Sequence, residues 1–109
     1  MSPVHAGYFL KEFAMRVITK KRIQEFATIH TGAAAALSVF HKLIIESQFS
    51  GPSDLQRTFG QVDYVKGLYV FNIGTGYRLI AAIHFHGQRL YVRHVLTHAE
   101  YDRGKWKPK

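Results

Sequence analysis

The sequence has no cysteine, and it contains only three prolines and seven acidic residues in a chain of 109 residues. Without cysteine the chain forms no disulfide and offers no thiolate to a metal ion or to a nucleophilic mechanism. No apolar run approaches the roughly 18 residues of a membrane-spanning helix, and the first residues lack the layout of a signal peptide. These absences exclude a disulfide scaffold and a thiol enzyme. They lead us to expect a cytoplasmic protein with no membrane partner.

The shortage of acidic residues leaves a strong positive charge. Fifteen Lys and Arg residues against seven acidic residues give a formal net charge of +8. A surface this basic favours a polyanionic partner, most often nucleic acid, although an acidic protein also fits. A basic surface without a dedicated partner is the alternative. Hydrophobic residues make up 47% of the sequence, which argues against disorder and predicts one domain with its own core.

The first half of the chain predicts an extension, a short strand and two helices. Residues 1–14 show no clean apolar period, so we interpret them as an N-terminal extension that precedes a single domain over residues 15–109. The domain opens with MRVIT, which is typical of a short strand. Apolar residues at helical spacing then predict a short helix over residues 20–30 and the main helix over residues 33–48.

The next segment predicts one more short helix and a loop. Ser53 and Gln56 have the spacing of a capping box, which favours a brief helix that ends at Phe59. Residues 60–67 are then expected to form a loop that leads to the edge of a sheet.

The second half of the chain reads as a three-stranded meander. Apolar, β-branched and aromatic residues predict strands over residues 69–73, 77–86 and 90–97. Glycine-bearing turns at residues 74–76 and 87–88 separate them, which is the usual hairpin signal. Beyond the third strand, Thr97 and Glu100 again have capping-box spacing and predict a turn of helix.

The two turns predict a register for the meander. We expect Ile73 to face Tyr77 across the first turn, and His86 to face Arg89 across the second. Because side chains alternate along a strand, this register gives one apolar core face. It places these residues on the opposite face: Asn72, Arg78, His84, Tyr91, Arg93 and Thr97, mixed with Val70, Ile80 and Val95. Two arginines on a half-apolar sheet face suggest that an anion binds there.

The sequence argues against a metal site. Seven histidines are present, but no H-x-x-x-H pair occurs on a predicted helix, and no cysteine is available. His84 and His86 share a predicted strand face, and His94 and His98 are four residues apart, spacings that favour weak metal binding at most. The sequence also lacks paired carboxylates for glycoside chemistry. A hairpin turn, not a phosphate-binding loop, explains Gly74-Thr75-Gly76. We therefore expect no cofactor.

Polar residues on and just beyond the meander suit metal-free cleavage of RNA. They are Lys66, Asn72, Arg78, Arg93, His94, His98, Tyr101 and Asp102. Histidine exchanges protons near neutral pH, arginine offers fixed donors to a phosphate, and tyrosine orients a nucleophile or stacks on a base.

Each of these residues also has a structural interpretation. Arg93 is explained equally by pairing with an acid, Tyr101 by packing, and His94 faces the core in the predicted register. Residue chemistry alone therefore leaves three classes open: a ribonuclease, a non-catalytic RNA-binding module and an interaction domain. Helices on one side of a three-stranded sheet also suit recognition of double-stranded RNA.

Three motifs give the chain a family resemblance. They are the opening MRVI, the stretch YVFNIGTGYRLI and the closing YVRHVLTHAEYD. With these motifs, residues 15–105 resemble the HigB-type toxins of bacterial type II toxin–antitoxin systems, a branch of the RelE-like mRNA interferases. The resemblance implies an α+β fold in which two helices pack on one face of a twisted antiparallel sheet, formed by the meander and a short N-terminal strand.

The resemblance also implies a function and partners. It implies cleavage of mRNA, usually in the ribosomal A site, without a metal. It implies neutralisation by a cognate helix-turn-helix antitoxin of the HigA type, with DNA bound only through that antitoxin. A non-catalytic RNA-binding module is the alternative function.

The resemblance assigns roles to several site residues. Arg78 matches the sheet arginine that contacts the scissile phosphate, His98 and Tyr101 lie in the terminal motif, and Arg93 occupies a strand position where relatives often keep a cation. We expect these four residues to be catalytic, with His98 in proton transfer and Tyr101 in orienting the substrate. Further RNA contacts are predicted without a role taken from the family: Lys66, Asn72, Lys105 and Trp106.

Overall fold

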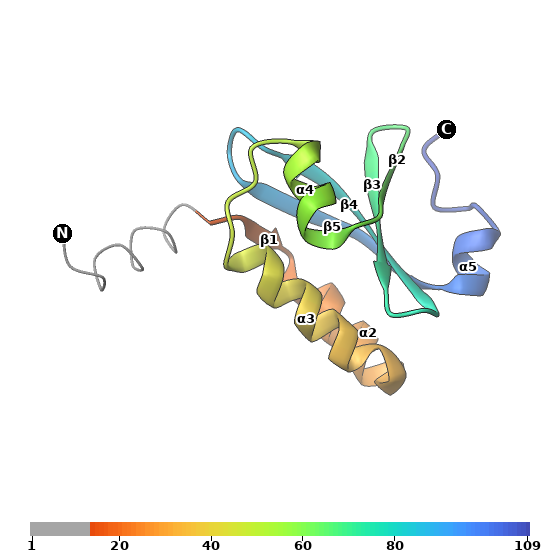
Figure 1. Ribbon diagram of the computed structural model, residues 1–109. Helices are drawn as coiled ribbons and strands as arrows, with labels where there is room; N and C mark the ends of the chain where they lie inside the picture. The colour runs from red at the N-terminus through yellow and green to blue at the C-terminus, as the bar shows by residue number, and fades with distance from the viewer. Residues whose placement is uncertain (1–13) are drawn as a thin grey trace.

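The centre of the protein is a five-stranded sheet with strand order β1-β5-β4-β3-β2, seen in a computed structural model that describes residues 14–109 (Figure 1). The strands are β1 (Arg16–Ile18), β2 (Val62–Val65), β3 (Leu68–Ile73), β4 (Tyr77–His84) and β5 (Arg89–Thr97). Apart from Ala14, the predicted N-terminal extension lies outside the described residues. The chain has the expected α+β class.

The helices are α2 (Lys20–Ile29), α3 (Ala34–Ile45), α4 (Pro52–Phe59) and α5 (His98–Asp102), with a 3₁₀ turn at Thr31–Ala33 before α3. The two main helices are confirmed, although α3 ends earlier than predicted. The short helix α4 is also confirmed, but its predicted cap is wrong, because the helix begins at Pro52 with Gly51 as the N-cap. Asp54 instead accepts hydrogen bonds from the backbone and side chain of Ser50, at 2.7 and 2.6 Å.

Two features of the sheet differ from the prediction. First, β1 pairs with β5 in parallel, Arg16 beside Arg89, so the sheet is mixed rather than antiparallel. Second, the predicted loop over residues 60–67 contains β2, which pairs with β3 in an antiparallel hairpin. Its turn is Lys66-Gly67, where both residues have positive φ, 49° and 88°. A two-residue hairpin turn of type I′ requires positive φ at both central residues, and Lys-Gly is a weaker signal for it than Asn-Gly.

The register of the meander is half confirmed. Across the first turn Ile73 pairs with Tyr77, as expected. Across the second turn the prediction is wrong: His84, not His86, pairs with Arg89, because residues 85–88 form a longer loop. Gln88 stabilises that loop, since its side-chain amide donates to the carbonyl oxygen of Phe85 at 2.7 Å.

A register shift opposite Ile80 and Ala81 then exchanges the faces of β5. Ala81 pairs with Val92 and Ile80 with His94, so Arg93 is the extra residue on β5. As a result Leu96, not Thr97, lies opposite Arg78. A one-residue shift moves every following side chain to the other face, which no local sequence signal predicted.

The sheet carries a core on each face. The helix-side core packs α2, α3 and α4 against the sheet around fully buried residues such as Leu37, Ile44, Phe71 and Leu79. The opposite face has a smaller cluster of Val70, Ile80 and Trp106. In Figure 1, α4 and α5 lie on opposite sides of the β2–β3 hairpin. Among residues 14–109, no helix is long and apolar enough to cross a membrane.

Candidate functional site

Arg78 lies on the sheet face opposite the main helices. It pairs with Asn72 on β3 and with Leu96 on β5, so the predicted neighbour Asn72 is confirmed and Thr97 is replaced by Leu96. The guanidinium is half-buried and donates a hydrogen bond to the carbonyl oxygen of Tyr77 at 2.8 Å. Its Cζ lies 5.6 Å from the ring centroid of Tyr101, within the range of a cation–π contact. Two predicted site residues therefore meet.

The short helix α5 is held in place by the predicted capping box. The backbone N–H of Glu100 donates to the Thr97 hydroxyl at 3.2 Å, and the backbone N–H of Thr97 donates to the Glu100 carboxylate at 2.9 Å. The bond from Thr97 lowers the pKa of Glu100 below its ordinary value. The backbone N–H of His98 also donates to the carbonyl oxygen of Gly76 at 2.8 Å, which ties α5 to the β3–β4 turn. These bonds fix the start of the element that carries His98 and Tyr101.

His98 is oriented by an acid that the sequence reading had left without a role. Its Nδ1 lies 2.9 Å from Oδ2 of Asp102, one helical turn further along α5. Both side chains are more than half exposed, at 54% and 59%. A carboxylate at Nδ1 favours a proton on that nitrogen and leaves Nε2 as the proton acceptor. The four-residue spacing on a predicted helix is the signal that would have identified this pair.

Trp106 is part of the protein interior. Only 6% of the residue is exposed, and it packs with Val70 and Ile80. Its Nε1–H donates to the carbonyl oxygen of Tyr101 at 3.0 Å, and the two rings stack with centroids 5.2 Å apart and planes at 12°. The ring is therefore closed to a stacking base in this structure, and a packing role replaces the predicted RNA contact.

His94 differs from its prediction. It pairs with Ile80 and so lies on the face of Arg78, not on the helix-side core face. It lines a hollow of about 190 Å³ that Leu96 and Trp106 also line. Burial, and then the charges of Arg22 and Arg93, lower the pKa of His94 below 6.5.

The remaining predicted residues are more scattered. Arg93 is exposed at the register shift, where its carbonyl oxygen accepts a hydrogen bond of 2.7 Å from Arg22 on α2. Asn72 is exposed beside Arg78 and donates to Gln61 at 3.3 Å. Lys105 is exposed and lines the hollow beside Trp106. Lys66 lies in the β2–β3 turn, at the end of β3 away from Asn72. The site therefore centres on Arg78 and α5.

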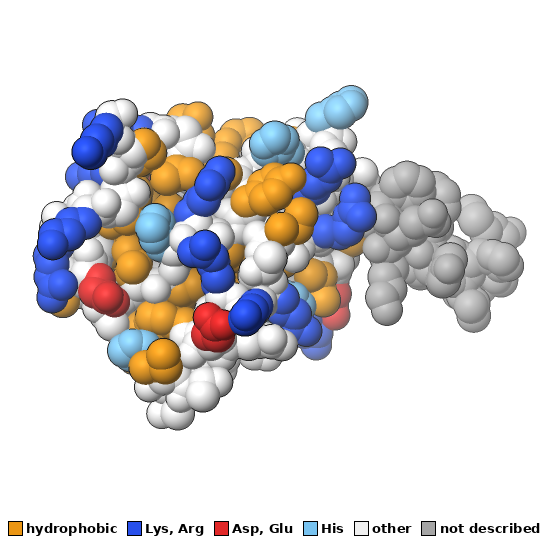
Figure 2. Space-filling view, turned by 180° about the vertical axis from the view of Figure 1, so that it is seen from behind, with side chains coloured by type: hydrophobic (Ala, Val, Ile, Leu, Met, Phe, Trp, Pro, Cys, Tyr) orange, Lys and Arg blue, Asp and Glu red, His pale blue; other side chains and the backbone are white. Residues whose placement is uncertain are grey.

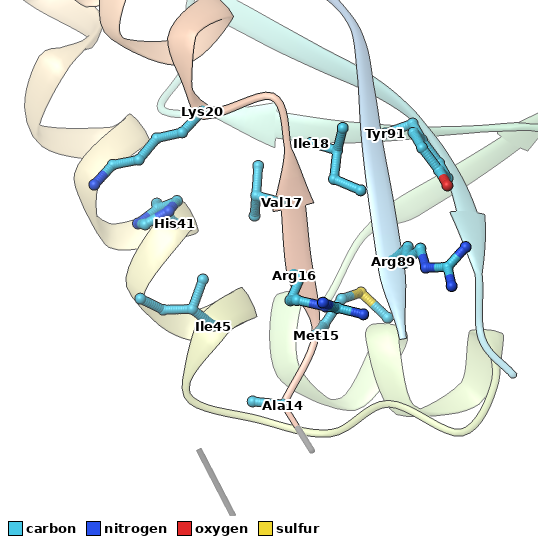
Figure 3. A pocket seen from close by; sticks show the side chains of 10 residues that line it. All are labelled: Ala14, Met15, Arg16, Val17, Ile18, Lys20, His41, Ile45, Arg89 and Tyr91. Atoms are coloured by element: carbon cyan, nitrogen blue, oxygen red, sulfur yellow. The ribbon is translucent and has the colours of Figure 1, made fainter. Parts of the chain in front are cut away.

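A second hollow, of about 700 Å³, lies at the β1 edge of the sheet. Figure 3 shows Lys20, His41 and Ile45 on one side of β1, and Arg89 and Tyr91 on the other. Burial, and then the charge of Lys20, lower the pKa of His41. None of the predicted site residues lines this hollow, so it is separate from the candidate site.

The surface carries the charge that the composition predicts. In the view from behind, Lys and Arg side chains spread over the face with apolar side chains between them and few acids (Figure 2). Within residues 14–109, no three His, Asp or Glu side chains gather in an arrangement that would hold a metal ion. Arginine and tyrosine on a basic surface suit a phosphate-bearing ligand.

The fold and the site define a class of protein: a small, basic α+β domain with an arginine on the open sheet face and a histidine and a tyrosine on the helix that follows the last strand. The profile of the HigB toxin family, the RelE-like toxic component of a toxin–antitoxin system, matches residues 33–104. The chain belongs to this family, as the resemblance in its motifs indicated.

Two relatives illustrate the similarity. The mRNA interferase HigB of Escherichia coli O6:H1 (strain CFT073) is 34% identical over 93 residues, which cover 82% of this chain and 90% of the relative. The mRNA interferase toxin HigB of Escherichia coli K12 is 34% identical over 92 residues, covering 81% and 88%.

Proposed function

We propose that this chain is an endoribonuclease that cleaves mRNA and thereby inhibits translation. Membership in the HigB family and the names of the two relatives support this activity. The structural observation that carries it is the contact of Arg78 with Tyr101 on α5, the helix that also presents His98. One phosphate-binding group and two groups able to handle protons thus belong to neighbouring elements.

The reaction follows from what each group offers. The 2′-OH of the nucleotide before the cut attacks the phosphorus, the O2′–P bond forms, and the P–O5′ bond breaks. The 2′-OH loses a proton, and the leaving 5′-oxygen gains one. Nε2 of His98, with its ring held by Asp102, is suited to proton transfer, and Tyr101 orients the substrate or assists. Arg78 stabilises the charge that gathers on the phosphorane.

Partners and conditions complete the proposal. The net charge of +8 supports binding to a polyanion such as ribosome-bound mRNA. A cognate helix-turn-helix antitoxin neutralises the toxin, and DNA is reached only through it. The reaction uses no metal, because the proposed groups supply both the proton transfers and the phosphate contact. Exposed Asn72 and Lys105 extend the RNA contact on either side of Arg78.

The test is cleavage of end-labelled mRNA by purified protein, free and on ribosomes. The protein is first treated with chelator and then moved to ribosome buffer, so that the ribosomes stay intact. Arg78→Ala and His98→Ala should each lower the cleavage rate by about a hundredfold or more, as expected for losing phosphate stabilisation or a positioned proton-transfer group. Arg57→Ala is the control, because Arg57 is exposed on α4 and pairs with Asp54.

Three results would contradict parts of the proposal. Near-wild-type cleavage by Arg78→Ala and His98→Ala would reject the assigned site. Loss of wild-type activity after chelation would bring back a metal other than Mg²⁺, because the ribosome buffer supplies Mg²⁺ again. RNA binding without cleavage by the wild-type protein would favour the non-catalytic RNA-binding module.

A further inference from the structure

Trp106 joins the C-terminal tail to the helix that carries the proposed site. It is the only tryptophan in the sequence. Its indole is buried against Val70 of β3 and Ile80 of β4, so the rigid sheet fixes its position. From there it makes two contacts with Tyr101: the ring stack at 5.2 Å and the hydrogen bond from Nε1 to the backbone carbonyl at 3.0 Å.

Helix α5 needs such a support. It has five residues, none of them buried, and its capping box holds only the first turn. A helix this short is not stable by itself in water. Tyr101 is at its C-terminal half, where the ring also contacts Arg78. The contacts with Trp106 hold this second half of α5, both at its backbone and at its ring.

We propose that Trp106 is a positioning residue for the reaction: the indole, seated on Val70 and Ile80, aligns Tyr101 against Arg78. This inference rests on the proposed function and adds to it a residue that touches no RNA. Misplacing a reacting group by about 1 Å can cost about a hundredfold in rate. Trp106 should therefore affect the rate of the bound complex more than the affinity for RNA.

Three variants separate alignment from simple burial. Trp106→Leu keeps an apolar side chain over Val70 and Ile80 but removes the flat ring and the N–H donor. Trp106→Phe keeps an aromatic ring for the stack and removes the N–H donor together with the second ring of the indole. Ile44→Val removes packing from the helix-side core, which contains neither Trp106 nor Tyr101.

The measurement is single-turnover cleavage of mRNA over a range of protein concentrations, which separates the maximal rate from the half-saturating concentration. Trp106→Leu should lower the maximal rate about ten- to a hundredfold with little change in the half-saturating concentration. Trp106→Phe should lie closer to wild type. Ile44→Val should lower the melting temperature and keep the maximal rate. Wild-type rates for Trp106→Leu, or equal losses for Trp106→Leu and Ile44→Val, would overturn the inference.

Hydrogen exchange of the α5 amides tests the same claim without RNA. Trp106→Leu should speed exchange in residues 98–102, and Ile44→Val should not. Unchanged exchange in Trp106→Leu would overturn the positioning role even if the protein cleaves mRNA. If the wild-type protein fails to cleave mRNA, the proposed function fails, and the exchange result still decides whether Trp106 holds α5.

Discussion

Arg78 shows how a single residue can be assigned from the sequence when its neighbours are local. It follows a three-residue turn after β3, and that turn fixes the pairing of Asn72 with Arg78. His94 could not be assigned in the same way, because its face depends on the register shift between β4 and β5. Trp106 was predicted from its basic surroundings to contact RNA, but its apolar ring is buried against the sheet.

At the residue scale, we expect His94 to make the stability of the protein depend on pH. Burial and two arginines lower its pKa below 6.5, so the folded chain binds this proton less tightly than the unfolded chain. The neutral His94 therefore contributes stability that is fully present above the unfolded value and is lost as the pH falls through the folded pKa. When the pH is lowered from about 7.5 to about 5, the melting temperature of His94→Gln should fall less than that of the wild-type protein.

The comparison of His94→Gln with wild type needs a second histidine variant as a control. His86→Gln changes an exposed histidine of the 85–88 loop and should keep the wild-type pH response. The effect of His94→Gln should be partial, because the pKa of His41 is lowered as well. Identical pH dependence of His94→Gln and wild type would show that His94 does not carry this response.

At the element scale, the sequence was most informative where the signal is local. Residue spacing predicted α2 and α3, and the Thr97–Glu100 pair predicted the start of α5. Helix α4 was predicted from a capping pattern that its N-terminus does not use. The sequence did not predict β2, because Lys-Gly is a weak turn signal and the strand is only four residues long. It also missed the shift in β5, since a bulge is set by pairing with a distant strand and not by residues within β5.

The capping box of α5 yields a prediction for stability and activity together. Glu100→Ala should lower the free energy of unfolding by about 1 kcal/mol, in line with a lost cap. It should also lower the cleavage rate, because α5 carries His98 and Tyr101. Glu100→Gln is the conservative control, since glutamine can also accept the bond from Thr97. Circular dichroism and the mRNA cleavage assay measure the two effects.

The difference in stability between Glu100→Ala and wild type should vanish at acidic pH. The pKa of Glu100 is lowered from 4.5, chiefly by the bond from the Thr97 backbone. Its contribution is therefore present above the unfolded value and is lost as the pH falls through the folded pKa. A gap between Glu100→Ala and wild type that persists unchanged far below pH 4.5 would contradict the carboxylate's role in the cap.

At the scale of the whole molecule, the boundary of the domain is still a prediction. Met15 is 1% exposed, and its backbone N–H donates to the carbonyl oxygen of Ser47 at 3.1 Å. Among the described residues, a chain that begins at Met15 loses only Ala14 from the buried core. We expect it to fold and to cleave mRNA like the full chain. A large fall in melting temperature on this truncation, measured by circular dichroism, would show that the domain includes earlier residues.

The central claim is that the groups around Arg78 promote cleavage of mRNA by attack of a 2′-OH of the mRNA itself. The most direct test is an mRNA in which the nucleotide before a mapped cleavage site carries 2′-deoxyribose. The account predicts no cleavage at that site, and it predicts a 2′,3′-cyclic phosphate and a 5′-hydroxyl on the products of unmodified mRNA. Continued cleavage at the 2′-deoxy position, or products that end in a 5′-phosphate, would contradict it, because both require water as the nucleophile.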